Sequence, residues 1–474
     1  MISKKISGKF LTFDDVLLLP KKSPINSRAE IDLTSDLGKF KLNLPIISSP
    51  MDTVTESKMA IAMAKSGGLG IIHRFCSIEE QVEEVKKVKR AQNWIIENPI
   101  TISPTTTVRE ILDLASFYGF NTFPVIDEQK KLLGLVCKRD YIFQEKNKKA
   151  YEIMTPYEKL ILSKKILKIK EAVNLFKKFR IEKIPIVDNE RKLIGLITAK
   201  DVGSVTDPKV LKDKKGKLLV GAALGIKGDF LERAKELVKA GCDILVIDVA
   251  HGHLVKTLKA VKKIKNNFPN IPLIAGNVAT PEGAKDLISS GADIVKVGIG
   301  PGSICSTRIV SGVGVPQLSA ILWIREKIKN AYIIADGGCK NSGDIVKALA
   351  AGANAVMLGS LLAGTKEAPG KVVFLNGKRV KLFRGMSSVL AYENKLEKTR
   401  EDKNYLPISE GLDIGYVPYK GGVSLILEDL EKGIRSGFSY CGARNIKELW
   451  KNAEFIEISY GGIKESGFHN VIIG

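Results

Sequence analysis

Short runs of β-branched and aliphatic residues recur along the chain, and each is followed by small or polar residues. The eight runs span residues 44–49, 68–73, 218–224, 244–250, 273–278, 294–300, 332–338 and 355–360. Between most of them lie stretches whose apolar residues recur at helical spacing, such as residues 229–241 (DFLERAKELVKAG). Near-continuous apolar strands that alternate with helices are typical of a parallel sheet covered on both faces.

Eight strand–helix units predict an α/β fold, a closed (β/α)₈ TIM barrel. We expect its first part over residues 1–92 and its second part, with the catalytic loop and a flap, over residues 208–474. A doubly wound open sheet is the alternative. A dinucleotide-binding fold of that kind needs a GxGxxG motif after an early strand, and the sequence has none there.

The residues between the second and third runs contain an internal repeat. Residues 123–140 (FPVIDEQKKLLGLVCKRD) return as residues 184–201 (IPIVDNERKLIGLITAKD) without a gap. An amphipathic helical segment precedes each copy, at residues 108–119 and 169–180. The sequence therefore predicts an inserted pair of small α/β domains, one over 93–148 and one over 149–207.

The chain of 474 residues carries a formal net charge of +22. Its lysines are mixed with glutamates in helical segments such as residues 81–90 (QVEEVKKVKR), without interleaved aromatic residues. This pattern indicates a solvated, lysine-rich surface, whose positive charge would also attract anionic nucleotides. It makes nucleic acid an unlikely partner. Six cysteines without CxxC spacing predict reduced thiols in the cytoplasm. No run approaches 18 apolar residues, so we expect no membrane span.

The candidate chemistry centres on residues 295–315 (VKVGIGPGSICSTRIVSGVGV). A β-branched run ends there in a series of glycines, and Cys305 follows. Glycines of this density let the backbone turn tightly and approach a ligand closely. A thiol beside exposed amide N–H groups is a candidate nucleophile. A buried structural cysteine in an ordinary turn is the alternative.

This stretch, with Arg308 after Ser306 and Thr307, resembles the catalytic loop of the IMP dehydrogenase and GMP reductase family. The resemblance also includes LTFDDVLLLP near the start, SSPMDTVTE from Ser48, and KESGFHN near the end, so it covers nearly the whole chain. It implies that the Cys305 thiolate adds to C2 of a purine nucleotide and that Thr307 assists proton transfer. Hydride then leaves C2 for a nicotinamide, and water resolves the covalent thioimidate.

The active site of such a barrel lies at the carboxyl ends of the strands. Asp336, just before two glycines, is placed to accept hydrogen bonds from ribose hydroxyls, with a turn-capping aspartate as the alternative. The resemblance implies that the purine nucleotide is held by Ser49, Met51, Ser303, Asp336, Gly337, Gly338, Gly359, Ser360, Gly385, Met386, Ser387 and Glu410. It implies that NAD, or NADP in a reductase, lies against Asp248, Asn277, Gly298, Ile299 and Gly300.

A potassium ion is a further implication of the resemblance. Its ligands would be carbonyl groups of Gly300, Gly302 and Cys305, completed by the Glu465, Ser466 and Gly467 positions of a neighbouring subunit. Members of the family form homotetramers, which inserted repeat pairs can join into octamers. The two histidines of DVAHGH (residues 248–253) lack a third ligand at helical spacing, so a metal site there is disfavoured.

The repeat resembles a pair of cystathionine-β-synthase-type domains, the insert found in IMP dehydrogenases. The resemblance implies adenine or guanine nucleotides at this pair, with Thr198 and Asp201 in the second copy matching a Thr-x-x-Asp ribose motif. The first copy has Cys137 and Asp140 at these positions. A purely structural or assembly module is the alternative.

The sequence of the flap distinguishes the IMP dehydrogenases from the GMP reductases of this family. IMP dehydrogenases carry an adjacent Arg-Tyr pair there as the water-activating base, whereas here Arg400 and Tyr405 are the nearest candidates. The form Gly-Met-Ser-Ser from Gly385 is common in GMP reductases. The insert and SPMDTVTE are more typical of dehydrogenases. We therefore expect an IMP dehydrogenase that forms XMP. A GMP reductase that uses NADPH and releases ammonia is the alternative, and a non-catalytic nucleotide-sensing scaffold is a third possibility.

Overall fold

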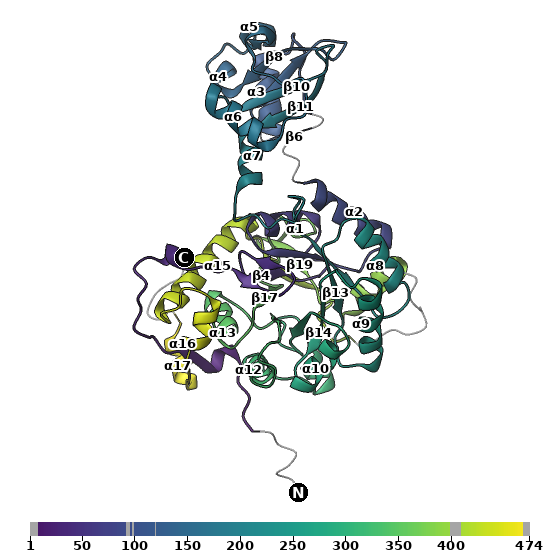
Figure 1. The fold of residues 1–474 in the computed structure, drawn as a ribbon, viewed down its shortest axis with the longest axis vertical. Helices are drawn as coiled ribbons and strands as arrows, with labels where there is room; N and C mark the ends of the chain where they lie inside the picture. The colour runs from purple at the N-terminus through teal and green to yellow at the C-terminus, as the bar shows by residue number, and fades with distance from the viewer. Residues whose placement is uncertain (1–7, 92–94, 97–98, 119, 399–408, 468–474) are drawn as a thin grey trace. The chain divides into compact units, whose positions relative to one another are not determined.

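A computed structural model describes residues 8–91, 95–96, 99–118, 120–398 and 409–467. The chain divides into two compact units, one formed by residues 1–91 and 209–474 and the other by residues 92–208 (Figure 1). The larger unit has one hydrophobic core and the smaller unit has two, so each unit is described by itself.

The larger unit is built on a closed barrel of eight parallel strands, which confirms the predicted TIM barrel. The strands follow one another around the barrel in the order β12, β13, β14, β15, β16, β17, β4, β5. Their bounds are Ile46–Ser48 (β4), Leu69–Ile72 (β5), Gly221–Leu224 (β12), Ile244–Asp248 (β13), Leu273–Val278 (β14), Ile294–Val297 (β15), Ile333–Asp336 (β16) and Ala355–Leu358 (β17). Since β4 pairs with both β5 and β17, the sheet has no free edge and is not an open doubly wound sheet.

Helices surround the barrel strands (Figure 1). They are α1 (Ser57–Lys65), α2 (Ile78–Arg90), α8 (Phe230–Lys239), α9 (Val255–Asn267), α10 (Pro281–Ser289), α12 (Gln317–Lys327), α13 (Ser342–Ala350) and α15 (Val423–Tyr440). Local sequence sets where they begin: a capping box of Ser77 and Glu80 starts α2, and Thr280 with Pro281 starts α10. Almost every barrel strand residue is buried, because helices cover the outside and side chains fill the inside.

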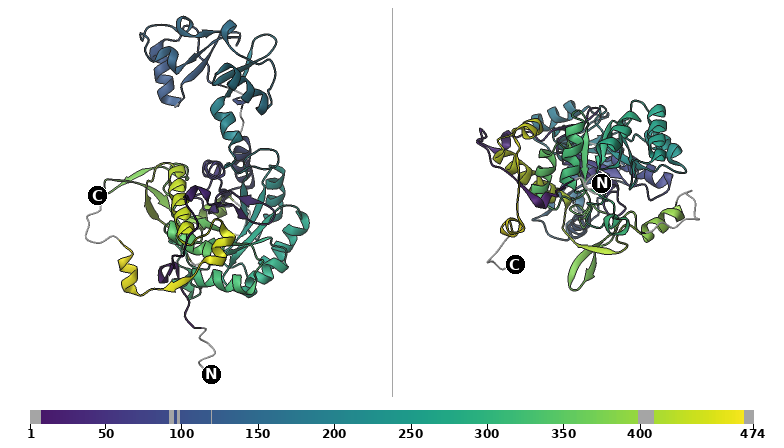
Figure 2. Two further views of the ribbon diagram at one scale, coloured as in Figure 1. Left: turned by 60° about the vertical axis from the view of Figure 1, so that its left-hand side comes forward. Right: turned by 90° about the horizontal axis from the view of Figure 1, so that it is seen from below.

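A small antiparallel sheet is attached after the last barrel strand. It consists of β18 (Val373–Leu375), β19 (Lys378–Phe383) and β20 (Gly415–Pro418), and α14 (Val389–Lys398) lies between β19 and β20 in the sequence. Figure 2 shows the β18–β19 hairpin, in light green, projecting from the barrel. The flap predicted from the sequence therefore starts and ends on neighbouring strands of one sheet.

Shorter elements complete the larger unit. They are β1 (Val16–Leu18), β2 (Ser35–Asp36), β3 (Lys41–Leu42), α11 (Thr307–Ser311), α16 (Ile446–Asn452), β21 (Phe455–Glu457), α17 (Tyr460–Glu465), and the 3₁₀ turns Phe13–Asp15 and Arg28–Glu30. Strand β1 pairs antiparallel with β21, which joins the two ends of the chain.

The smaller unit contains two three-stranded sheets of the same design. One has the order β7 (Thr122–Ile126), β8 (Leu132–Cys137), β9 (Thr155–Pro156), and the other β10 (Lys183–Val187), β11 (Leu193–Thr198), β6 (Ile95–Ile96). Its helices are α3 (Val108–Tyr118), α4 (Lys138–Tyr141), α5 (Ala150–Ile153), α6 (Ile169–Phe179) and α7 (Ala199–Thr206), with a 3₁₀ turn at Tyr157–Lys159. The two hairpins even share a register shift, between Val125 and Ile126 and between Ile186 and Val187.

A buried ammonium group ties α2 to the bottom of the barrel. The side chain of Lys89 is 7% exposed, and its Nζ lies 2.6 Å from Asp243 and 3.0 Å from Asp213. It also donates to the carbonyl of Leu218 at 2.9 Å. All three donor positions of the ammonium group are therefore used, which offsets the cost of removing its charge from water.

We expect Lys89→Met to destabilise the protein by about 3–5 kcal/mol, because the half-buried Asp243 would be left without its cation. Urea unfolding followed by circular dichroism measures the loss. The matched control on the same helix is Lys87→Met, which removes an exposed pair with Glu84 at 2.6 Å and should cost about 1 kcal/mol or less. Equal losses in the two variants would contradict the structural role of Lys89.

Candidate functional site

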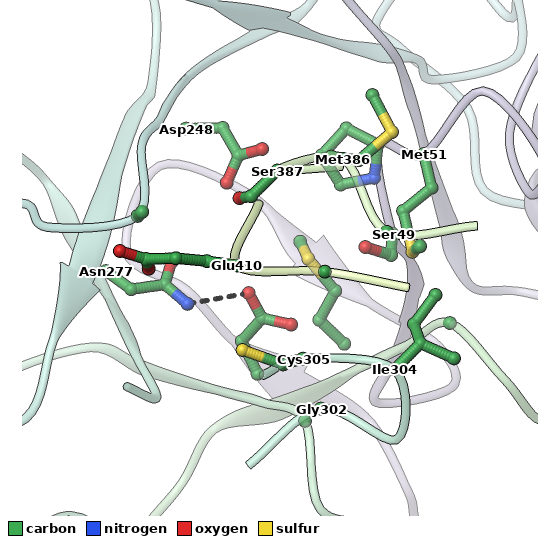
Figure 3. Close-up of a pocket in the computed structure, with 18 of the residues that line it drawn as sticks. Ser49, Met51, Asp248, Asn277, Gly302, Ile304, Cys305, Met386, Ser387 and Glu410 are labelled. Atoms are coloured by element: carbon green, nitrogen blue, oxygen red, sulfur yellow. Dashed lines mark hydrogen bonds between the residues drawn. The ribbon is translucent and has the colours of Figure 1, made fainter. Parts of the chain in front are cut away.

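A cavity of about 250 Å³ lies at the end of the barrel where the strands finish. Many predicted residues line it: Ser49, Met51, Asp248, Asn277, Gly302, Ser303, Cys305, Asp336, Gly337, Gly359, Gly385, Met386, Ser387 and Glu410. In the view of Figure 3, Asp248 and Asn277 lie on one side of the cavity and Ser49, Met51 and Ile304 on the other. Residues of seven barrel strands or of the loops that follow them meet here with residues of the flap, because every strand of a parallel barrel ends at the same rim.

Cys305 begins a short chain of hydrogen bonds at this cavity. Its thiol is exposed and donates to Thr307 Oγ1 at 3.2 Å. The Thr307 hydroxyl in turn donates to Glu410 Oε2 at 2.8 Å. A proton that leaves the thiol therefore has a path through a hydroxyl to a carboxylate, which is what activation of a thiol nucleophile requires.

The cysteine loop is paired with the end of the flap. Ser306 N donates to the carbonyl of Glu410 at 2.9 Å, and Leu412 N donates to the carbonyl of Ile304 at 3.0 Å. Gly385 N donates to the carbonyl of Leu412 at 2.8 Å, so both ends of the flap are joined beside the cysteine. This pairing brings Glu410 to Thr307 although 102 residues separate them in the sequence.

Glycine is required where the cysteine loop leaves β15. Gly298 has a φ of +152°, and a Cβ there would lie 2.1 Å from the carbonyl oxygen of Asp336. Gly300 has a φ of +81°, and a Cβ there would meet the side chain of Arg308 at 2.5 Å. The loop can pass this close to β16 at Gly298, and to its own Arg308 at Gly300, only because these positions have no side chain.

A lysine that the sequence analysis missed forms the floor of the cavity. Lys296 is buried in β15, with its Nζ 2.7 Å from Asp248 Oδ1 and 2.6 Å from Asp336 Oδ2. It also donates to Asn277 Oδ1, while Asn277 Nδ2 donates to Asp336 Oδ2 at 3.0 Å (Figure 3). The signal was present, since Lys296 interrupts an otherwise apolar strand.

The charge of Lys296 is fixed by its surroundings. Burial by itself lowers the pKa of the ammonium group, but the charges of Asp248 and Asp336 and their hydrogen bonds outweigh burial and raise that pKa. Lys296 therefore stays protonated at neutral pH and holds the two carboxylates in place.

Arg74 and Phe75, which follow β5, also line the cavity and were missed by the sequence analysis. The guanidinium carbon of Arg74 lies 5.1 Å from the centre of the Phe75 ring. Their position just after the second apolar run could have identified them as site residues, because the active-site loops of a parallel barrel follow its strands.

The root of the flap is fixed to the loop after β4. Arg384 Nε donates to Asp52 Oδ2 at 3.0 Å, and its Nη2 bonds to the same oxygen. Asp52 N approaches the sulfur of Met386 at 3.4 Å. These contacts hold Met386 near Met51. Two methionines that are far apart in the sequence therefore line the same cavity.

Some predicted residues lie elsewhere. Five are near the cavity but do not line it: Gly298, Ile299, Gly300, Gly338 and Ser360. Arg400 and Tyr405 lie outside the described residues. Glu465 ends α17, and Ser466 and Gly467 follow it.

The predicted regulatory positions belong to the smaller unit. Asp140 Oδ2 accepts the backbone N–H of Cys137 at 2.7 Å, at the start of α4. Thr198 is buried at the end of β11, and Asp201 belongs to α7.

Among the described residues, no group of three or more His, Cys, Asp or Glu side chains could hold a metal ion. Within the same residues, every helix is too short or too polar to cross a membrane.

We expect iodoacetamide to label Cys305 before the other five cysteines, because its thiol is exposed while four of the others are buried and Cys137 is half-buried. Burial raises the pKa of the Cys242 thiol to about 12, which suppresses its thiolate at neutral pH. Peptide mass spectrometry over a time course measures the order. Cys305→Ala is the control that should lose the first label, and earlier labelling of Cys137 would contradict the assignment.

Comparison with known proteins shows similarity to IMP dehydrogenases over nearly the whole chain. The chain matches the IMP dehydrogenase / GMP reductase domain over residues 10–469. It is 49% identical to an inosine-5'-monophosphate dehydrogenase of Aquifex aeolicus, covering 100% of this chain and 97% of the relative. A Bacillus subtilis protein of the same name is 48% identical, with 100% and 98% covered.

Solved structures of GMP reductase from Trypanosoma brucei are also similar. A variant in complex with guanosine 5'-monophosphate aligns with a TM-score of 0.81 at 41% identity, covering 100% of both chains. A second structure of the same variant aligns with a TM-score of 0.87 at 39% identity, covering 98% of this chain and 100% of the other.

Proposed function

The chain belongs to the IMP dehydrogenase and GMP reductase family. Of the two activities in this family, we propose that the protein has that of an IMP dehydrogenase. The enzyme oxidises IMP to XMP with NAD⁺ and water. The observation that carries this choice is full-length identity of 46–49% to relatives named inosine-5'-monophosphate dehydrogenase, against 38–41% to the GMP reductase structures.

Cys305 is the catalytic nucleophile in this proposal. Its thiol proton passes to Thr307 and on to Glu410, and the thiolate sulfur forms a bond to C2 of the purine. NAD⁺ supplies the acceptor for the hydride that leaves the tetrahedral C2 with its electron pair. Water then adds to C2 of the thioimidate, the C–S bond breaks with its electrons returning to Cys305, and XMP is released.

The cavity residues divide between the two reactants. Lys296 and Asn277 occupy Oδ2 of Asp336, which leaves Oδ1 to accept hydrogen bonds from the ribose of the substrate. Met51 and Met386 lie where the purine base would stack, with Ser49, Ser387 and Glu410 around its edge. The phosphate is assigned to Ser303, Gly337, Gly338, Gly359 and Ser360.

NAD fits the other side of the cavity. Asp248 and Asn277 line it there. Gly298, Ile299 and Gly300 lie near the cavity without lining it, and they are assigned to the cofactor because the two glycines let it approach the backbone. Lys296, whose Nζ lies 2.7 Å from Asp248 Oδ1, would hold the Asp248 carboxylate in place beside the cofactor.

The carbonyl groups of the cysteine loop also fit a monovalent cation. Among the described residues, the carbonyl oxygens of Gly300 and Cys305 accept no hydrogen bond, and that of Gly302 accepts one, from Cys305 N at 3.1 Å. Carbonyl oxygens are the ligands that potassium prefers. Glu465, Ser466 and Gly467 of a neighbouring copy would complete the site in a homotetramer or octamer.

The water-activating base is assigned to Arg400 and Tyr405 on the flap. The GMP reductase alternative rests on the absence of an adjacent Arg-Tyr pair in the sequence and on the solved structures above. Such an enzyme would convert GMP to IMP and ammonia with NADPH.

The insert is assigned as a cystathionine-β-synthase-type pair that binds adenine or guanine nucleotides. The six free thiols favour a cytoplasmic enzyme.

We expect the protein to reduce NAD⁺ in the presence of IMP and potassium, seen as rising absorbance of the reduced nicotinamide. Cys305→Ala should abolish this turnover and leave the dissociation constant for IMP within about threefold, since only the nucleophile is removed. Cys137→Ala is the control and should keep full activity. Oxidation of NADPH with GMP, with ammonia released and no reaction with IMP, would make the enzyme a reductase.

We expect Asp201→Ala to weaken adenine-nucleotide binding to the insert, because its carboxylate is the proposed partner of the ribose hydroxyls. Isothermal titration of ATP and GTP into the full-length protein measures the effect. Asp140→Ala tests the first copy separately, where the carboxylate also caps the backbone of Cys137. Unchanged affinity in Asp201→Ala would make the module structural.

A further inference from the structure

The turn after β17 is held from behind by a lysine with no role in the mechanism above. Lys420 lies just after β20 and is half-buried. Its Nζ donates to the carbonyl of Ser360 at 2.7 Å and to that of Leu361 at 3.1 Å. Burial lowers the pKa of this ammonium group, because the charged form loses hydration there.

The same turn carries unpaired donors next to Gly359. Gly359 lines the cavity, and its carbonyl accepts the N–H groups of Leu362 and Ala363 at 3.1 and 2.9 Å. Among the described residues, the N–H groups of Ser360 and Leu361 have no hydrogen-bond acceptor. The turn therefore has free amide hydrogens at one end and lysine-bound carbonyls at the other.

The planarity of the peptide group connects these two ends. The carbonyl of Ser360 and the N–H of Leu361 belong to one peptide plane and point in opposite directions. A cation fixed on the carbonyl therefore fixes the direction of the N–H, and it compensates the negative end of the turn's dipole. An anion at the amide end gains from both effects.

We propose that Lys420 is a positioning residue for the phosphate of the purine nucleotide, acting through the peptide groups of Ser360 and Leu361. The inference rests on the proposed function, which assigns the phosphate to Gly359 and Ser360. Lys420 also joins this turn to the strand that ends the flap, because its backbone N–H donates to the carbonyl of Gly364 at 3.0 Å.

The chain contains a close control for this role. Lys381 in β19 is 2% exposed and donates to the carbonyls of Thr365 and Ala368, farther along the same loop. Lys381 and Lys420 thus make the same kind of contact, but only Lys420 bonds the peptide groups next to Gly359. If general stability of the loop controlled nucleotide affinity, loss of the more deeply buried Lys381 would be the more harmful change.

The test is the dissociation constant of IMP and of inosine, measured by titration calorimetry or competition in the full-length protein. We expect Lys420→Met to weaken IMP about tenfold and leave inosine unchanged, because inosine lacks the phosphate. Lys420→Arg should stay within about threefold of wild type, since it keeps the charge and the donors. Lys381→Met should lower the melting temperature while IMP affinity stays within about twofold.

Three results would overturn the proposal: wild-type IMP affinity in Lys420→Met, an equal loss for inosine, or an equal loss of IMP affinity in Lys381→Met. Lys420→Gln, which keeps a donor without the charge, replaces Lys420→Met if that variant does not fold. Repeating the titrations with GMP separates this inference from the proposed function. If wild type reduced no NAD⁺ with IMP, the phosphate-dependent loss in Lys420→Met would still be measurable with GMP.

Discussion

Closure of the parallel barrel is the constraint on which the rest of the larger unit depends. Because β4 pairs with both β5 and β17, all eight strands run in the same direction around a closed ring. Every loop that follows a strand must then leave at one rim. Asp248, Asn277 and Asp336, which lie at the ends of three strands, and Cys305, which follows a fourth, reach one cavity for this reason. The buried charge of Lys296 is tolerated because closure also brings two carboxylates to it.

Around this rim the flap and the strand-end loops are held largely through backbone groups. Glu410 and Leu412 pair with the cysteine loop, Arg384 fixes the flap root to Asp52, and Lys420 bonds the carbonyls of the turn after β17. Such contacts set the direction of amide groups and of one thiol without placing many charged side chains in the cavity. A site of this kind suits a nucleotide whose reacting atom needs a nucleophile and whose phosphate and ribose need donors and acceptors in fixed positions.

The two family activities share this arrangement, so the cavity alone does not separate them. In the mechanism proposed above and in its reductase alternative, the thiol adds to C2 of the purine and hydride is transferred at that carbon. The two differ in the other group at C2, which is water that enters in the dehydrogenase or ammonia that leaves in the reductase, and the residues assigned to activate the water belong to the flap. Full-length identity to IMP dehydrogenases, rather than the geometry of Cys305, is therefore what favours the dehydrogenase.

The sequence by itself determined the eight strand–helix units, the repeated insert and the nucleophilic loop, because periodicity and glycine density are local properties of the chain. It also placed Asp336, Asn277 and Asp248 at strand ends. Only the tertiary structure decided which groups touch. It joined Glu410 to Thr307 across the flap, showed Lys296 as an ion-pair partner, added Arg74 and Phe75 to the cavity, and put Lys420 behind the turn at Ser360. These contacts join residues far apart in the sequence, and no periodicity encodes which side chains barrel closure brings within a few ångströms.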